Sequence, residues 1–168
     1  SGQVERLVQD LKAAERASAE LVILRIDTPG GMLEPTRVLI QAILDSPVPV
    51  VGYVAPAGAR ASSAGTYILA ATHVAAMAPA TNVGSAKPVF IGFGEIDEDS
   101  KLKATNDASA QMRALAQLRN RNAEWLEQSV VAAKNITAEE ALGLGVIDLI
   151  AVNQNDLLKQ LQGRQIQM

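Results

Sequence analysis

Apolar side chains recur along this chain with two periods, and the two alternate as expected in a layered α/β domain. Some segments repeat apolar residues at the spacing of an amphipathic helix, and others are short continuous apolar runs typical of buried parallel strands. Helices are predicted over 3–17, 33–44, 63–71, 108–118, 122–133 and just after 137, and buried strands over 20–26, 50–54 and 74–77. Residues 79–103 show neither period, which predicts a long loop acting as a flap.

Two polar, glycine-rich segments follow two of the predicted strands. Asp27-Thr28-Pro29-Gly30-Gly31 follows the strand 20–26, and Gly58-Ala59-Arg60-Ala61-Ser62-Ser63-Ala64-Gly65 comes after the strand 50–54. Ligands of open parallel sheets lie outside the carboxyl ends of the strands. We therefore expect these two segments to lie together at one edge of the sheet.

The second segment places two hydroxyls among small residues where a helix begins. Small neighbours let the backbone turn sharply, and the positive end of the helix dipole favours oxyanion chemistry at a serine. The same residues suit an inert helix start, because serine is a common N-cap. Both interpretations stay open on this segment alone.

The paired glycines of the first segment can present backbone N–H groups to a ligand. Together with the N–H that follows a nucleophile, such a group forms an oxyanion hole, in which one donor is typically worth about 3 kcal/mol. The alternative is an ordinary Pro-Gly-Gly turn.

Three separated motifs resemble the NfeD family of serine proteases, which belongs to the wider ClpP/crotonase fold. They are residues 26–31, 58–67 and 103–108, and the similarity runs from about Val4 to Val152. The resemblance implies an α/β, ClpP/crotonase-like layered sheet with flanking helices. It also implies a membrane-associated protease with a Ser-Lys dyad that cuts hydrophobic segments of membrane partners, stomatin-like proteins above all.

The resemblance assigns roles to particular residues of this chain. Ser63 is the expected nucleophile, and Ser62 stands where relatives commonly carry alanine. By analogy with the fold, Gly31 and Ala64 are the expected N–H donors of the oxyanion hole.

Lys103 is the expected base, because it stands before Ala104-Thr105-Asn106 as the family lysine stands before its own Thr-Asn. Lys101 and Lys87 are lower-ranked candidates. A lysine base needs its neutral form near pH 7, whereas the free side chain has a pKa of about 10.4. The acidic residues between 95 and 99 oppose that change, so the dyad requires Lys103 to turn inward while those acids face solvent.

The count of nucleophiles and bases supports a lysine. The chain has no cysteine, which excludes a cysteine nucleophile, and a single histidine, His73. His73 opens the apolar run 74–77, so we interpret it as a histidine at a strand edge. In ClpP the catalytic histidine corresponds to residues 85–88, where this chain has none.

Composition narrows the function classes. At 168 residues and 48% apolar, with only 3% aromatic, the chain can bury one aliphatic core, so we expect a single domain over 1–168. A net charge of −3 without a long basic cluster argues against nucleic-acid binding. Without cysteine or paired histidines we predict no metal site and no cofactor.

No apolar run reaches the roughly 18 residues of a membrane span, so this segment by itself is expected to be soluble. Relatives continue into transmembrane helices. We therefore expect residues 1–168 to be the protease domain of a longer membrane protein. The resemblance further implies an extracytoplasmic protease domain and a homodimer or higher homo-oligomer.

Two other functions remain as alternatives. A crotonase-like enzyme acting on an acyl-coenzyme A thioester uses the same paired N–H donors. A catalytically silent scaffold of a membrane assembly needs the serine pair only as a helix cap.

Overall fold

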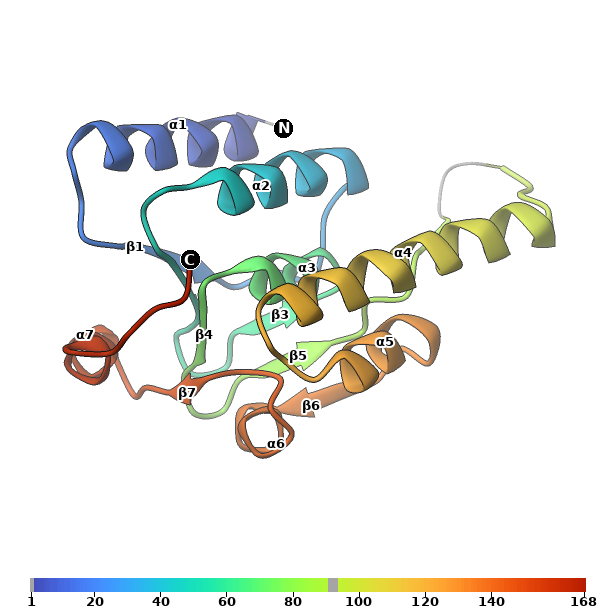
Figure 1. The fold of residues 1–168 in the computed structure, drawn as a ribbon. Helices are drawn as coiled ribbons and strands as arrows, with labels where there is room; N and C mark the ends of the chain where they lie inside the picture. The colour runs from blue at the N-terminus through green and yellow to red at the C-terminus, as the bar shows by residue number, and fades with distance from the viewer. Residues whose placement is uncertain (1, 91–93) are drawn as a thin grey trace.

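Two small sheets and seven helices organise the described part of the chain (Figure 1). The computed structural model describes residues 2–90 and 94–168, apart from the side chain of Leu33. In chain order the elements are α1 (Gly2–Arg16), β1 (Val22–Ile26), α2 (Leu33–Asp45), β2 (Val50–Val54), β3 (Arg60–Ser62), α3 (Ala64–Ala71), β4 (Val74–Met77), β5 (Asn82–Gly84), α4 (Glu98–Leu118), α5 (Ala123–Val131), β6 (Asn135–Thr137), α6 (Ala138–Gly143), β7 (Leu149–Ile150) and α7 (Gln154–Leu161).

The larger sheet is parallel, in the order β1-β2-β4-β7, and has a core on each face. Val50 and Val54 of β2 belong to the core formed with α1 to α6, whereas Val51 and Tyr53 pack in a second core with α7. Because both faces of β2 are covered, the strand is a continuous apolar run rather than an alternating one. The predicted α/β layered class is confirmed.

Strand β1 differs from the fully buried strand predicted over 20–26. Val22, Ile23 and Leu24 are only half-buried, and Arg25 is exposed. Among the described strands, β1 is hydrogen-bonded to β2 alone, so it lies at the edge of the sheet. An edge strand packs less completely than its sequence of apolar residues suggests.

Helix α3 is almost entirely buried and is held at its carboxyl end by two arginines. Arg119 donates to the carbonyl of Ala71, and Arg121 donates to the carbonyl of Ala70, each over 2.9 Å. The Arg121 side chain is only 1% exposed and forms an ion pair of 2.8 Å with Asp148. These cations satisfy carbonyls that have no partner within the helix.

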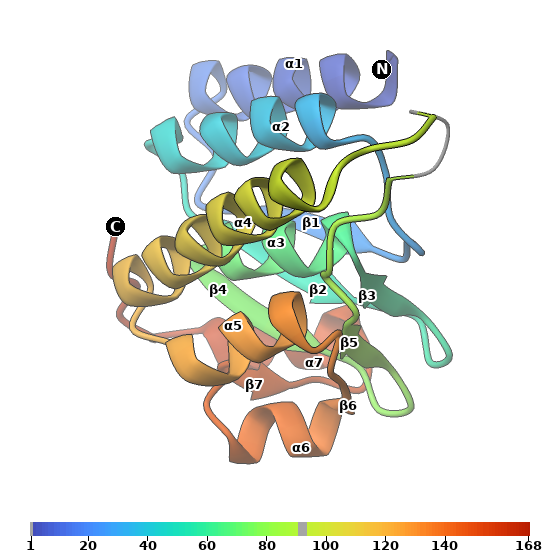
Figure 2. The same cartoon turned by 90° about the vertical axis from the view of Figure 1, so that its right-hand side faces the viewer.

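Helix α4 begins ten residues earlier than predicted, so the expected flap over 79–103 is wrong at both ends. The first part of the segment 79–103 contains strand β5, and the last part of that segment is helical. The Asp97 carboxylate caps α4 by accepting from the N–H of Ser100 over 2.6 Å, and Glu98 and Asp99 complement the helix dipole. The acidic run is therefore a helix start. Figure 1 shows this end of α4 projecting from the body, and Figure 2 shows the helix crossing α3 and α5.

Short elements account for the other differences. Strands β3, β5, β6 and β7 have two or three residues each and were not predicted, because so few residues carry no periodicity. The helix predicted just after 137 is α6, which opens with a capping box formed by Thr137 and Glu140. No helix in residues 2–90 or 94–168 combines the length and apolar character needed to cross a membrane.

His73 has the structural role expected of it. The residue is 8% exposed, and its Nδ1 accepts a hydrogen bond of 2.9 Å from the N–H of Val50. Burial, reinforced by the nearby Arg119 and Arg121, lowers the pKa of His73 from 6.5 to about 4. The neutral ring thus fixes the start of β2.

Acidification should destabilise the protein through His73. As the pH falls from 6.5 to about 4, the unfolded chain binds a proton at this residue that the folded chain excludes. The contribution is fully present above pH 6.5 and shrinks through this window, by about 1–3 kcal/mol in the free energy of unfolding. Urea unfolding at pH 7.5 and pH 4 should show a smaller loss in His73→Gln than in the parent. Equal losses would contradict a buried neutral histidine.

Candidate active site

Ser63 lies in a sharp turn between β3 and α3, with φ of 53° and ψ of −117°. Such a backbone conformation is rare for a residue with a side chain, and a strained strand-to-helix turn is how α/β hydrolases expose a nucleophilic serine. The Ser63 N–H donates to the carbonyl of Gly84 over 2.9 Å, which ties the turn to β5.

The N-cap interpretation of Ser63 is not supported by its geometry. The residue occupies the N-cap position of α3, but its side chain makes no capping hydrogen bond. A Cβ placed on Gly30 would lie 3.4 Å from Ser63 Oγ, so the hydroxyl lies against the diglycine loop. The two segments expected to meet at one edge of the sheet do so.

The expected oxyanion-hole residues also lie side by side. A Cβ on Gly31 would be 3.9 Å from the Cβ of Ala64, the residue directly after Ser63. Ala64 is the first residue of α3, whose N-terminal N–H groups carry partial positive charge. The N–H groups of the loop and of the helix start could therefore donate hydrogen bonds to one oxygen atom.

Thr66 is a site-supporting residue that sequence reasoning missed. Its side chain is fully buried, and its hydroxyl lies 2.9 Å from the carbonyl of Ala61 and 2.8 Å from that of Gly84 while accepting the N–H of Gly84 over 3.2 Å. One hydroxyl thus joins α3, β3 and β5 around Ser63. A threonine three residues after the serine carries no signal of this contact in sequence.

The segment after β5 is held by the other side of α3. The Tyr67 hydroxyl donates to the carbonyl of Ala86 over 2.8 Å, and burial raises the pKa of Tyr67 to about 12. The tyrosine therefore remains a neutral donor at physiological pH. This contact fixes the chain that leads from β5 toward α4.

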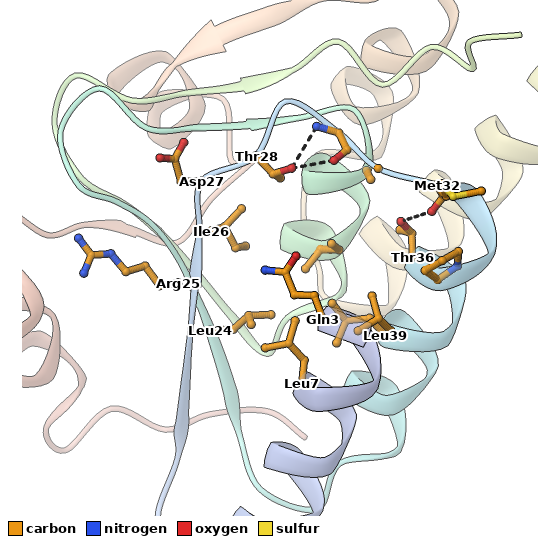
Figure 3. Close-up of a pocket in the computed structure, with 16 residues that line it drawn as sticks. Gln3, Leu7, Leu24, Arg25, Ile26, Asp27, Thr28, Met32, Thr36 and Leu39 are labelled. Atoms are coloured by element: carbon orange, nitrogen blue, oxygen red, sulfur yellow. Dashed lines mark hydrogen bonds between the residues drawn. The ribbon is translucent and has the colours of Figure 1, made fainter. Parts of the chain in front are cut away.

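A cavity of about 300 Å³ opens beside the diglycine loop (Figure 3). Its walls come from α1, β1, α2 and α3, and Leu7, Leu24 and Leu39 point into it. Gly31 and Ala64 form part of its lining. The space next to the proposed oxyanion hole is thus mainly apolar.

The structure does not bring the expected base to Ser63. Lys103 lies in the projecting end of α4, its side chain is 78% exposed, and its ammonium pairs with Asp99 over 3.3 Å. It faces solvent instead of turning inward. The dyad stays a prediction.

The two lower-ranked lysines lie elsewhere. Lys101 is half-buried and pairs with Glu98 over 3.5 Å, and it lines a second hollow with Phe90. Lys87 is exposed. Ile91 and Phe93, which belong to the segment expected to form a flap, lie outside the described residues.

Residues that could hold a metal ion are not gathered anywhere in the described chain, where no three His, Asp or Glu side chains cluster suitably. The groups that the expected site residues offer are a serine hydroxyl, backbone N–H donors and a lysine that would have to approach.

Comparison with known proteins places this arrangement in the ClpP-like α/β fold. A serine-to-alanine variant of the 1510-N membrane-bound stomatin-specific protease superposes with a TM-score of 0.90 at 37% identity, covering 98% of this chain and 80% of that one. A lysine-to-alanine variant of 1510-N in complex with a substrate peptide gives 0.88 at 36% identity, covering 97% and 75%.

The sequence comparisons define the family. The family described as NfeD1b, N-terminal domain, matches residues 2–167, and the chain belongs to it. The membrane-bound protease PH1510 of Pyrococcus horikoshii is 40% identical over 152 residues, which cover 89% of this chain. The membrane protein NfeD1b of Bacillus subtilis is 32% identical over 159 residues, which cover 94%. The chain spans only 34% of the length of either relative.

A side chain at Gly30 should disturb the site. Its φ of 147° disfavours any L-residue, and an added Cβ would lie 3.1 Å from Ser63 Cβ. Gly30→Ala is expected to lower the free energy of unfolding by about 1–3 kcal/mol in chemical denaturation.

Gly143→Ala is the matched control, because the added methyl has no heavy atom within 4 Å other than those of its chain neighbours and of the α6 backbone. It should be neutral or stabilising by up to about 1 kcal/mol. Equal stability of the two variants would show that Gly30 is not packed against the serine.

Proposed function

We propose that this domain is a serine endopeptidase. Ser63 attacks the carbonyl carbon of the scissile bond, and Lys103 accepts the serine proton and returns it to the leaving amine. The N–H groups of Gly31 and Ala64 stabilise the tetrahedral oxyanion. Water then hydrolyses the acyl-enzyme.

The conformation of Ser63 is the observation that carries the proposal. In a serine that merely starts a helix, the hydroxyl would accept a capping hydrogen bond. Ser63 instead adopts a positive φ, and its hydroxyl lies against the diglycine loop. Strain of this kind persists only where the surroundings hold it, and it clusters at functional sites.

The relatives support both members of the dyad. PH1510 is named a protease, and the 1510-N variants replace one serine and one lysine by alanine. Those two positions are separated by nearly the same number of residues as Ser63 and Lys103. The match of spacing favours Lys103 over Lys101 and Lys87.

For this mechanism Lys103 must leave Asp99 and lose its proton. An ammonium paired with a carboxylate cannot act as a base, and approach to Ser63 requires the projecting end of α4 to shift or unwind. Little packing opposes such a change, because residues 98–103 are exposed or half-buried. Binding of a substrate chain over the site would desolvate the amine and favour its neutral form.

The proposed substrate is a hydrophobic segment of a membrane-associated, stomatin-like protein. The 1510-N protease is named as specific for a stomatin homolog. In this chain the apolar cavity lies beside the oxyanion loop, and Met32, Val89 and Leu102 on the site segments are exposed. Apolar side chains of a substrate would cover them.

We place the domain in a longer, membrane-associated protein with this domain on the extracytoplasmic side, working as a homodimer or higher homo-oligomer. Both curated relatives are named as membrane proteins. The same exposed apolar side chains next to the site could pack against a second copy, because such patches commonly mark interfaces.

The dyad can be tested with a fluorophosphonate probe and a peptide cleavage assay. The parent should be labelled at Ser63, and Ser63→Ala should be neither labelled nor active. Lys103→Ala should lower kcat by about 10²- to 10⁴-fold, the usual contribution of a general base.

Ser62→Ala, Lys101→Ala and Lys87→Ala are the controls and should stay within a few-fold of the parent. Cleavage that survives Lys103→Ala would move the base to Lys101 or Lys87. An unlabelled parent that binds coenzyme A would favour the thioester enzyme, and a Ser63→Ala variant altered only in stability would favour the scaffold.

Substrate preference is a separate expectation. With an apolar cavity beside the cut, kcat/KM for peptides with leucine or valine next to the scissile bond should exceed that for lysine or glutamate by about 10-fold or more. Mass spectrometry of a digested peptide library measures the preference. Equal cleavage of apolar and charged sequences would refute it.

A further inference from the structure

Thr28 connects the two loops of the site through its backbone. Its N–H donates to the carbonyl of Arg60 over 2.8 Å, and its carbonyl accepts the N–H of Ser62 over 3.1 Å. The residue therefore bridges β3, the strand that leads directly into Ser63. Any displacement of Thr28 is shared with the nucleophile.

The Thr28 hydroxyl forms hydrogen bonds with both backbone groups of Gly30. It donates to the Gly30 carbonyl over 2.8 Å and accepts the Gly30 N–H over 3.1 Å, as the dashed lines in Figure 3 show. A hydroxyl has one hydrogen and two lone pairs, so it can make both bonds at once. Neither bond can be made by an apolar side chain of the same shape.

The first of these bonds sets the direction of the Gly31 N–H. The Gly30 carbonyl and the Gly31 N–H belong to one planar trans peptide, in which they point in opposite directions. When the carbonyl is held toward Thr28, the N–H must point away from it. A flipped peptide would turn the N–H back and remove a donor from the proposed oxyanion hole.

The diglycine loop needs such a restraint. Two adjacent glycines have wide backbone freedom, and Gly30 is found at a φ of 147°. Sterics alone do not select one orientation of the peptide between them. The hydroxyl supplies the selection.

The methyl group of Thr28 has a different contact. Thr28 Cγ2 lies 2.8 Å from the position a Cβ on Gly65 would occupy, so it packs against the first turn of α3. The two branches of the side chain can therefore be separated by mutation.

We propose that Thr28 is a positioning residue for catalysis. Its hydroxyl orients the Gly30–Gly31 peptide so that the Gly31 N–H points toward the oxyanion. The inference rests on the proposed serine-protease function. It concerns the transition state, so it predicts an effect on kcat rather than on KM.

Two pairs of variants isolate the hydroxyl. Thr28→Val is compared with the parent, because it keeps the branched shape and removes the hydroxyl. Thr28→Ala is compared with Thr28→Ser, because both lack the methyl group and only the serine keeps the hydroxyl. In each pair the protein lacking the hydroxyl should show a kcat about 10- to 100-fold lower, with KM changed less than 3-fold. Thr28→Ser should restore most of the kcat that Thr28→Ala loses, even though both lack the methyl packing.

A peptide aldehyde that forms a tetrahedral adduct with the serine provides the second readout. Its affinity should fall by the same factor as kcat in Thr28→Val and Thr28→Ala. Thr72→Val is the control, because it removes another buried hydroxyl bond, to the carbonyl of Leu69 over 2.7 Å, at the far end of α3. It should leave kcat and aldehyde affinity within 3-fold of the parent.

The outcomes separate this inference from the function on which it rests. A parent that neither cleaves peptides nor reacts with a fluorophosphonate overturns the protease itself. An active parent whose kcat and aldehyde affinity are unchanged in both hydroxyl-free variants overturns the role of Thr28. A drop in thermal stability with an unchanged kcat assigns the hydroxyl to folding alone, and also overturns it. If Thr28→Val does not fold, the Ser and Ala pair decides.

Discussion

The backbone of Ser63 depends on hydrogen bonds that converge on Gly84. The Ser63 N–H and the Thr66 hydroxyl both donate to the carbonyl of this residue. Gly84 has a φ of 136° and lies in close contact with Lys134, just before β6. A Cβ there would lie 2.1 Å from the Lys134 carbonyl oxygen, so only glycine fits. Ser63 is thus held in a strained conformation by a backbone contact that no side chain could replace.

This restraint acts together with the packing of α3. All of its residues except Ile68 are buried, and its carboxyl end is held by Arg119 and Arg121, of which Arg121 is paired with Asp148. A buried ion pair is weak evidence for stability, but removing one partner would leave a charge uncompensated inside the fold. Ser63 therefore stands at the start of one of the most completely buried helices among the described residues.

The parts of the proposed site differ in how far they are preorganised. Ser63 and Ala64 stand at the start of the buried helix α3, and Gly31 lies beside Ala64 on an exposed loop, whereas Lys103 lies on an exposed helical end with a carboxylate beside it. Electrostatic stabilisation of an oxyanion requires donors that are already in place. A base can be delivered later, and the surface ion pair that must break for this is worth at most about 1 kcal/mol. Such a division would keep the serine inactive until a chain covers it.

The sequence by itself determined the layered α/β class, the central strands and the family, because long apolar runs and separated motifs are properties of local order along the chain. The meeting of the diglycine loop with Ser63 also followed from the rule that parallel strands end at the same edge. The start of α4 was recoverable too, since Asp97 and the acids after it form an N-cap signal that the flap interpretation overlooked.

What only the tertiary structure decided were the contacts between distant segments. The positive φ of Ser63, the burial of Thr66 between β3 and β5, the grip of Thr28 on Gly30 and the outward position of Lys103 all arise from packing, which no local pattern of residues encodes.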